Sequence, residues 1–374
     1  MGLAILLWGT STVIGQNNCW VAPCEPNACD PCAPCGATGS PFTFGGWIET
    51  GIYVNNNGGG SDNGPMHTAS NRRTDFLMNQ LYFYGEREMN TKRGFDWGAR
   101  ADFVYGVDGP SMQCYDGTFD ADWGLNRHGY AMSAYQVYGT LGYKNLSVMV
   151  GKFIGKVGWE ASASKDNFFY THSYCYWIEP ATHTGVLATY SVTDRLTLNA
   201  GWTAGADSGF NNPDNNSTVL TGFAYGLTDK ATVHYWINAG QQDTADYFVQ
   251  SLCFEWALTK RFTHVFQYNL RNDNAREGGR YSSYGINNHF LYKLNEQWGA
   301  GMRIEWLRDN GTFGYITDDP GDYYQVTLGL NWNPWENVSI RPEVRYDWCK
   351  GATPFANETR KDQVTGGCGV FVSF

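Results

Sequence analysis

The chain has 374 residues and a net charge of −10, with 16% aromatic residues, only 17% charged residues and 45 glycines. This mixture is unusual for a soluble globular protein, in which about 25% of residues are charged. The acidic balance leaves no basic stripe to neutralise phosphates, which excludes nucleic acid as the main partner. No apolar run of 18 residues follows the first fifteen residues, which excludes a helical membrane protein.

Residues 1–15 contain a short apolar core, GLAILLWGTSTVIG, followed by small residues. This order predicts a secretory signal peptide with cleavage after Gly15, although no Lys or Arg precedes the apolar core. A buried amino-terminal strand or helix is the alternative. An exported protein follows from the first interpretation.

Residues 16–41 are rich in cysteine, proline, alanine and asparagine and show no strand or helix periodicity. In an exported protein such cysteines form disulfides, and an odd number leaves one thiol for a partner outside the segment. Overlapping CxxC spacings could also form a zinc site, which is the less favoured interpretation. We expect a disordered, oxidised periplasmic tail. Its cysteines are Cys19, Cys24, Cys29, Cys32 and Cys35.

Residues 42–374 form a succession of period-two runs separated by turn residues, which predicts an all-β domain. Seven tight turns alternate with eight longer loops, and this asymmetry is typical of a transmembrane antiparallel up-and-down β-barrel with periplasmic turns and outer loops. Sixteen strands enclose an aqueous channel because side chains no longer fill so wide a barrel. The predicted strands are 42–54, 73–87, 94–107, 130–142, 145–154, 184–192, 195–206, 217–227, 230–240, 247–258, 261–272, 281–293, 296–307, 322–333, 337–348 and 363–374.

Charged side chains fall on one face of the clearest strands. In 337–348, Arg341, Glu343 and Arg345 alternate with Ile340 and Val344. An Arg or Lys on the lipid face near the midplane costs about 2–4 kcal/mol, so we assign the charged face to the lumen. The same reasoning places four further residues inside: Arg100, Asp102, Arg303 and Glu305.

The last strand, QVTGGCGVFVSF at 363–374, is an uncharged ribbon that ends on an aromatic residue. A closed barrel must pair its last strand with its first, because it leaves no edge. We therefore expect strand 363–374 beside strand 42–54. Phe374 would lie at the periplasmic rim, where it is similar to the carboxyl-terminal aromatic residue that the barrel-assembly machinery reads in outer-membrane proteins.

Two central runs, VMVGKFIGKVGWE at 148–160 and NFFYTHSYCYWIEPATHTGVLATY at 167–190, resemble the hallmark segment of the OmpL-like β-barrel porin family. The runs YQVYGTLGYKNLSV at 135–148 and NVSIRPEVRYDW at 337–348 are similar to flanking and late strands of that family. The resemblance covers most of residues 42–374 and implies a passive channel in the bacterial outer membrane. It carries over no catalytic residue and no cofactor, and it leaves the cysteine-rich segment unexplained.

The loop 155–183 is the longest predicted loop, and by analogy with sixteen-stranded porins we expect it to fold into the lumen and narrow it. Its charges would then face the charged wall and set ion preference. The alternative is that they lie in solvent above the barrel. The candidates on or beside the loop are Lys152, Lys156, Glu160, Lys165 and Glu179, opposite wall residues Arg100, Asp102, Arg303, Glu305, Arg341, Glu343 and Arg345.

Three classes of function fit such a barrel. A porin for small hydrophilic solutes is favoured by the uninterrupted strand pattern and the charged inner face. A structural or surface-attachment barrel, linked through the cysteine-rich tail, is the alternative. An enzyme is not expected, because no acid is placed to orient His172 or His183, and no metal site or cofactor is expected either. The expected partners are outer-membrane lipids, the barrel-assembly machinery and small hydrophilic solutes, with a homotrimer as one assembly.

Overall fold

The computed structural model describes residues 41–57, 76–115, 119–126, 128–243, 245–275, 279–311 and 320–374. The expected signal peptide and the five cysteines of the expected tail, Cys19 to Cys35, lie outside the described residues.

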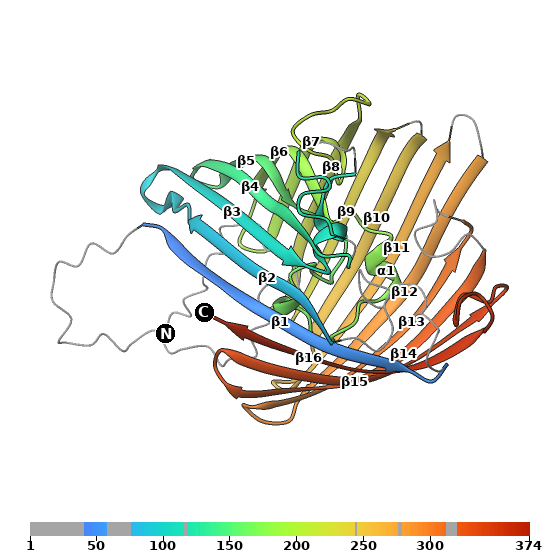
Figure 1. Cartoon of the computed structure of the whole chain (residues 1–374). Coiled ribbons are helices and arrows are strands. Elements are labelled where there is room, and N and C mark those ends of the chain that lie inside the picture. Colours follow the sequence, from blue (N-terminus) through green and yellow to red (C-terminus); the bar gives the residue numbers. More distant parts are fainter. Residues whose placement is uncertain are drawn as a thin grey trace.

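The described residues form one closed antiparallel β-barrel in which each strand pairs with the strand before and after it, as Figure 1 shows. The sixteen strands are β1 (Thr43–Asn55), β2 (Phe76–Arg87), β3 (Phe95–Gly106), β4 (Ala131–Tyr143), β5 (Leu146–Ile154), β6 (Thr182–Ser191), β7 (Leu196–Ala206), β8 (Ser217–Thr228), β9 (Ala231–Gln242), β10 (Ala245–Ala257), β11 (Phe262–Ala275), β12 (Gly279–Lys293), β13 (Trp298–Asp309), β14 (Gly321–Trp335), β15 (Val338–Lys350) and β16 (Asp362–Ser373).

The helical elements are single turns. They are η1 (Thr91–Arg93), η2 (Gly109–Met112), η3 (Ser164–Asp166) and α1 (Tyr174–Trp177). Within the described ranges, none of these helices has the length and the apolar character needed to cross a membrane.

The barrel closes where β16 pairs with β1, as the terminal ribbon predicts. The ladder runs from Trp47 opposite Ser373 to Asn55 opposite Thr365. Phe374 extends this pairing, because its N–H donates to the Gly46 carbonyl at 2.9 Å and its own carbonyl accepts from the Gly46 N–H at 3.0 Å. Its ring lies 5.6 Å from the ring of Phe83, so the aromatic terminus also packs across β1 onto β2.

All sixteen predicted strands are present, and their ends agree within three residues. The loop pattern is less regular than predicted. The sequence predicts long loops at 241–246 and 273–280. In the structure β9 ends at Gln242 and β10 begins at Ala245, while β11 ends at Ala275 and β12 begins at Gly279. Polar residues such as Gln241 and Asn274 continue the ladders there because outside the lipid layer a strand needs no apolar face.

The predicted division into two faces is confirmed on β15. Arg341, Glu343 and Arg345 are buried inside the barrel, whereas Val344 between them is 57% exposed on the outer face. Because successive side chains of a strand point to opposite faces, one register fixes the whole strand. The outer surface is therefore apolar and the interior is charged, which fits a barrel that stands in lipid around a polar lumen.

Candidate functional site: a loop folded into the barrel

The connection between β5 and β6, residues 155–181, lies inside the barrel and is called the lumen loop below. Its side chains are mostly buried, and its contacts reach strands on the far side of the lumen, β11 and β13 to β15, as well as β1 and β2. Figure 1 shows its α1 turn surrounded by the strands of the wall. The expectation that this loop enters the lumen is confirmed.

Three wall arginines bind the main chain of the lumen loop. Arg341 donates to the carbonyls of Ser164 and Asn167, each at 2.7 Å. Arg303 donates to the Thr171 carbonyl at 2.7 Å and to the His172 carbonyl at 3.2 Å, and Arg345 reaches the same His172 carbonyl at 2.5 Å. A guanidinium presents five N–H donors in a rigid fork, so one arginine can satisfy several carbonyls of an irregular chain at once.

Two wall carboxylates complement these arginines by accepting hydrogen bonds from main-chain N–H groups of the loop. Glu343 accepts from Tyr170 at 2.8 Å and from Thr171 at 3.3 Å. Glu305 accepts from Tyr174 at 2.7 Å and from Cys175 at 2.6 Å. Buried backbone groups must find partners, and here the alternating charges of β13 and β15 supply them. These wall residues therefore hold the loop in place.

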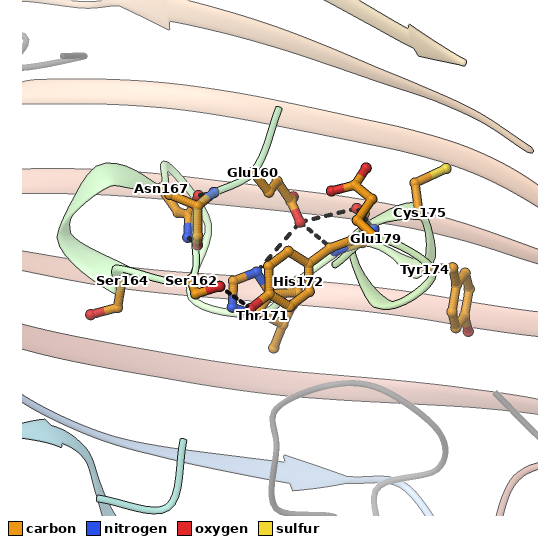
Figure 2. Close-up of polar contacts among 12 residues, drawn as sticks. Glu160, Ser162, Ser164, Asn167, Thr171, His172, Tyr174, Cys175 and Glu179 are labelled. Carbon is orange, nitrogen blue, oxygen red and sulfur yellow. Dashed lines mark hydrogen bonds and ion pairs between the residues drawn. The ribbon is translucent and has the colours of Figure 1, made fainter. Parts of the chain in front are cut away.

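Glu160 is the polar centre of the loop, and Figure 2 shows contacts converging on its carboxylate. It accepts from Arg303 at 2.7 Å and from the Ser173 N–H at 2.8 Å. His172 Nδ1 lies 3.5 Å from it, so the expectation that no acid lies beside His172 is wrong, because the fold of the loop brings residues 160 and 172 together. Burial by itself would raise the pKa of Glu160, but the Arg303 guanidinium and His172 hold this pKa well below its usual range. The carboxylate is therefore ionised, and Ser173, which it holds, is the N-cap of α1.

Glu179, near the end of the loop, lies in a different environment from Glu160. Its carboxylate accepts from the side-chain amides of Gln267 and Asn269 on β11 and has no cationic partner among the described residues. Burial raises the pKa of Glu179. Gly158, at φ +108°, passes so close that a Cβ there would lie 1.8 Å from Glu179 Oε2, so only glycine fits.

Three consecutive aromatic residues of the loop sit on glycines of the wall. A Cβ built on Gly301 of β13 would lie 2.4 Å from the ring of Phe168, and one on Gly329 of β14 would lie 3.0 Å from the ring of Phe169. For Tyr170 the corresponding glycines belong to β1 and β16. The absence of side chains at these inward positions creates the room that the rings fill.

Other predicted site residues lie apart from the contact between the lumen loop and strands β13 to β15. Lys152 is buried and pairs at 3.0 Å with Asp120, which belongs to the loop after β3. Arg100 pairs with Glu86 at 3.0 Å and Asp102 at 2.8 Å on its own part of the wall.

The two other lysines lie on the lumen loop. Lys165 pairs with its neighbour Asp166 at 2.8 Å. Lys156 is 4% exposed and has no ion-pair or hydrogen-bond partner among the described residues. Of the predicted loop charges, Lys156 is therefore the cation that no carboxylate neutralises.

Several residues that hold the loop were missing from the sequence prediction. They are Glu49, Asn79, Gln267, Asn269, Phe168, Phe169, Tyr170 and the inward glycines. A usable signal was the pairs of glycines two residues apart at inward positions, as in Gly299 and Gly301 or Gly367 and Gly369, which weaken a strand unless another group approaches closely. Within the described residues, no group of three or more His, Cys, Asp or Glu side chains is arranged to hold a metal ion.

A closed barrel of sixteen strands with an apolar exterior, a charged interior and a long loop folded against the inner wall is the architecture of an outer-membrane porin. The chain belongs to the family described as "Putative beta-barrel porin-2, OmpL-like", whose sequence profile matches residues 41–374. It is a porin of the bacterial outer membrane.

Solved porins share this fold at low sequence identity. The anion-selective porin from Comamonas acidovorans is 9% identical with a TM-score of 0.61, and the alignment covers 89% of this chain and 99% of that one. A loop-deletion mutant of OmpT from Vibrio cholerae is 12% identical with a TM-score of 0.58, and the alignment covers 89% of this chain and 99% of that one. OmpT in its trimer form is 12% identical with a TM-score of 0.55, and the alignment again covers 89% of this chain and 99% of that one. None of the curated proteins matches this sequence.

Proposed function

We propose that the channel passes small hydrophilic solutes by passive diffusion, that the lumen loop narrows it, and that it prefers cations to anions. The lumen loop supports the first two parts of this proposal, because it crosses the lumen from β5 to β13 and β15. Arginines of these two strands bind both its Glu160 side chain and its main-chain carbonyls. A polar lumen obstructed by a fixed loop selects by size and charge.

The pairing of the charges inside the barrel carries the proposed cation preference. The wall arginines are each bound to a carboxylate: Arg100 to Asp102, Arg271 to Asp273, Arg303 to Glu160, Arg341 to Glu49 and Arg345 to Asp347. Four further glutamates have no cationic partner among the described residues: Glu179, Glu255, Glu305 and Glu343. With Glu179 discounted for its raised pKa and Lys156 counted as an unpaired cation, the unpaired charges inside the barrel still leave a negative excess, which supports the proposed cation preference.

The test is the reversal potential of the purified protein in planar bilayers under a KCl gradient. We expect a potential of the sign that K⁺ permeation gives. A potential of the opposite sign would reject the cation preference and align this channel with the Comamonas porin, which is described as anion-selective.

Passive diffusion is tested separately by the swelling of liposomes in sugars of graded size. We expect uptake that falls as the sugar grows. The absence of size-dependent uptake by the folded protein would favour the structural or surface-attachment barrel, the second candidate, for which the five cysteines at 19–35 are the motivating feature. Removing residues 17–41 from the protein separates the contribution of that segment from that of the barrel.

We also propose a homotrimer. OmpT of Vibrio cholerae, which shares the fold, is described in a trimer form. The molar mass of the detergent-solubilised protein, measured by light scattering with the detergent contribution subtracted, distinguishes one 41.8 kDa chain from three.

A further inference from the structure

The closing ladder between β1 and β16 contains a pair of glycines that face each other directly. Gly51 of β1 is the register partner of Gly369 of β16, and both are inward positions. Cross-strand side-chain contacts are what normally stabilise one face of a sheet, and a pair of glycines provides none. The inner face of this ladder therefore lacks packing of its own at that point.

Tyr170 of the lumen loop covers this glycine pair. A Cβ on Gly51 would lie 2.4 Å from Cζ of the Tyr170 ring, and a Cβ on Gly369 would lie 2.4 Å from its Cδ2. Gly367, two residues earlier on β16, lies under the same ring at 3.2 Å by the same measure. The ring is 6% exposed and lies 6.0 Å from the ring of Tyr53 on β1. One aromatic ring thus lies across both strands of the closing ladder.

The polar atoms of Tyr170 reach the two strands that flank this ladder. Its hydroxyl donates to Asn79 Oδ1 of β2 at 3.0 Å, and its N–H donates to Glu343 Oε2 of β15 at 2.8 Å. Tyr170 therefore contacts four successive strands, β15, β16, β1 and β2.

A second contact of the lumen loop spans the same closure. Arg341 of β15 forms an ion pair with Glu49 of β1, across the intervening β16, and also donates to the loop carbonyls of Ser164 and Asn167. Next to it, Gln80 of β2 donates to the Ser162 carbonyl at 2.7 Å and accepts from the Ser164 N–H at 3.2 Å. The loop is therefore tied to β15, β1 and β2 at two separate places.

The β1–β16 ladder is where such support matters most. The other neighbouring strands are joined by short or moderate connections, whereas this ladder pairs residues as far apart as Trp47 and Ser373. Loop-closure entropy disfavours contacts between residues so distant in the sequence. An aromatic ring that covers glycines is also a known way to stabilise a sheet where side chains are missing.

We propose that the lumen loop locks the closure of the barrel, with Tyr170 as the residue that holds β16 to β1. Docking of the loop and closure of the barrel then stabilise each other, so the closing ladder between β1 and β16 is less stable in a chain whose loop is undocked. This role is independent of which solute the channel passes.

The test compares Y170A with F168A in the full chain, folded in detergent, by hydrogen exchange of peptides from β1, β16, β12 and β13. Phe168 is the matched control, because it is a loop aromatic on a glycine socket of β13, far from the closing ladder. We expect Y170A to exchange at least about tenfold faster in β1 and β16 with β12 and β13 unchanged, whereas F168A keeps the wild-type rates in β1 and β16. Equal rates in wild type and Y170A, or an equal effect of F168A, would overturn the proposal.

Two further variants keep the test decisive if Y170A does not fold. Y170F retains the ring and loses only the bond to Asn79, so we expect nearly wild-type protection of β1 and β16. G51A places a methyl group where the ring lies and should accelerate exchange in the same two strands. Wild-type protection in G51A would reject the lock, whatever the channel measurements give.

Discussion

At the scale of single residues, Lys156 is the lysine of the lumen loop whose charge no carboxylate of the described residues neutralises. It has no partner among the described residues, and burial together with the nearby Arg100 charge lowers its pKa to about 8. Below this pKa the side chain is cationic, and above it the side chain is neutral. Raising the pH from 7 to 9 therefore removes a positive charge from the lumen.

We expect this change of pH to raise the ratio of cation to anion permeability, on the order of twofold. K156M should show the higher ratio at both values, with little dependence on pH. The control is K165M, because Lys165 is already paired with Asp166 at 2.8 Å. Reversal potentials at the two pH values give the ratio, and a K156M channel that still responds as the wild type does would assign the titration to another group.

Arg303 is the residue on which the loop depends most directly, because it binds Glu160 and the carbonyls of Thr171 and His172. Replacing it with methionine leaves the Glu160 carboxylate buried without a cation, and removing one partner of a buried pair costs about 3–5 kcal/mol. We expect R303M to release the loop from the wall, which increases single-channel conductance and its fluctuation. R195M is the control, since Arg195 pairs with Asp229 in solvent, where such pairs contribute about 0–1 kcal/mol. A quiet R303M channel with wild-type conductance would show that the other contacts suffice.

Only part of this arrangement is predictable from the sequence. The alternation of Arg341, Glu343 and Arg345 with apolar neighbours was enough to place them inside, because the lipid face excludes charge. That they bind the main-chain carbonyls and N–H groups of the lumen loop, and not its charged side chains, was not predictable, because these groups belong to an irregular segment about 170 residues away. Lys152 shows the same limit, because its partner Asp120 lies in a separate loop whose path no periodicity encodes.

At the scale of elements, the strands were predictable and the lumen loop's fit was not. Period-two patterns define where a strand lies and which face is inside, so the sixteen strands agree within three residues at their ends. The loop is held by the complementary shapes of aromatic rings and inward glycines, which depend on the tilt and register of strands far apart in the sequence.

This fit predicts the effect of filling a socket. G301V places a side chain where the Phe168 ring lies, since even a Cβ would approach to 2.4 Å. The overpacking should cost about 1–3 kcal/mol and displace the loop segment around Phe168. We expect conductance to rise and the thermal unfolding temperature to fall. G226V is the control, because a Cβ built on Gly226 would have Arg195 Cγ, at 3.7 Å, as its nearest neighbour apart from the adjacent residues.

At the scale of the whole molecule, the barrel can exist in a membrane only when it is closed, because an open sheet edge leaves backbone groups unpaired in lipid. The other fifteen strands can therefore stand in lipid only when the last strand has paired with the first. Its end is fixed by two backbone hydrogen bonds between Phe374 and Gly46 and by the contact of the Phe374 ring with Phe83.

Deletion of Val372 to Phe374 removes both bonds and the ring, and with them the pairing of Val372 and Ser373 with Ile48 and Trp47. We expect the shortened protein to be missing from the outer membrane as a folded barrel. The readout is a heat-modifiable band in the outer-membrane fraction, which depends on a closed barrel that resists detergent.

The matched control removes three residues from the connection between β15 and β16, Ala356 to Glu358, which have positive φ angles and lie outside both strands. This deletion leaves the closing ladder intact and should still give the heat-modifiable band. A shortened carboxyl terminus that also gives that band would mean that the remaining ladder, from Glu49 to Asn55, is sufficient to close on β16. The lock that Tyr170 provides further along the same ladder would then be the dominant contact of closure.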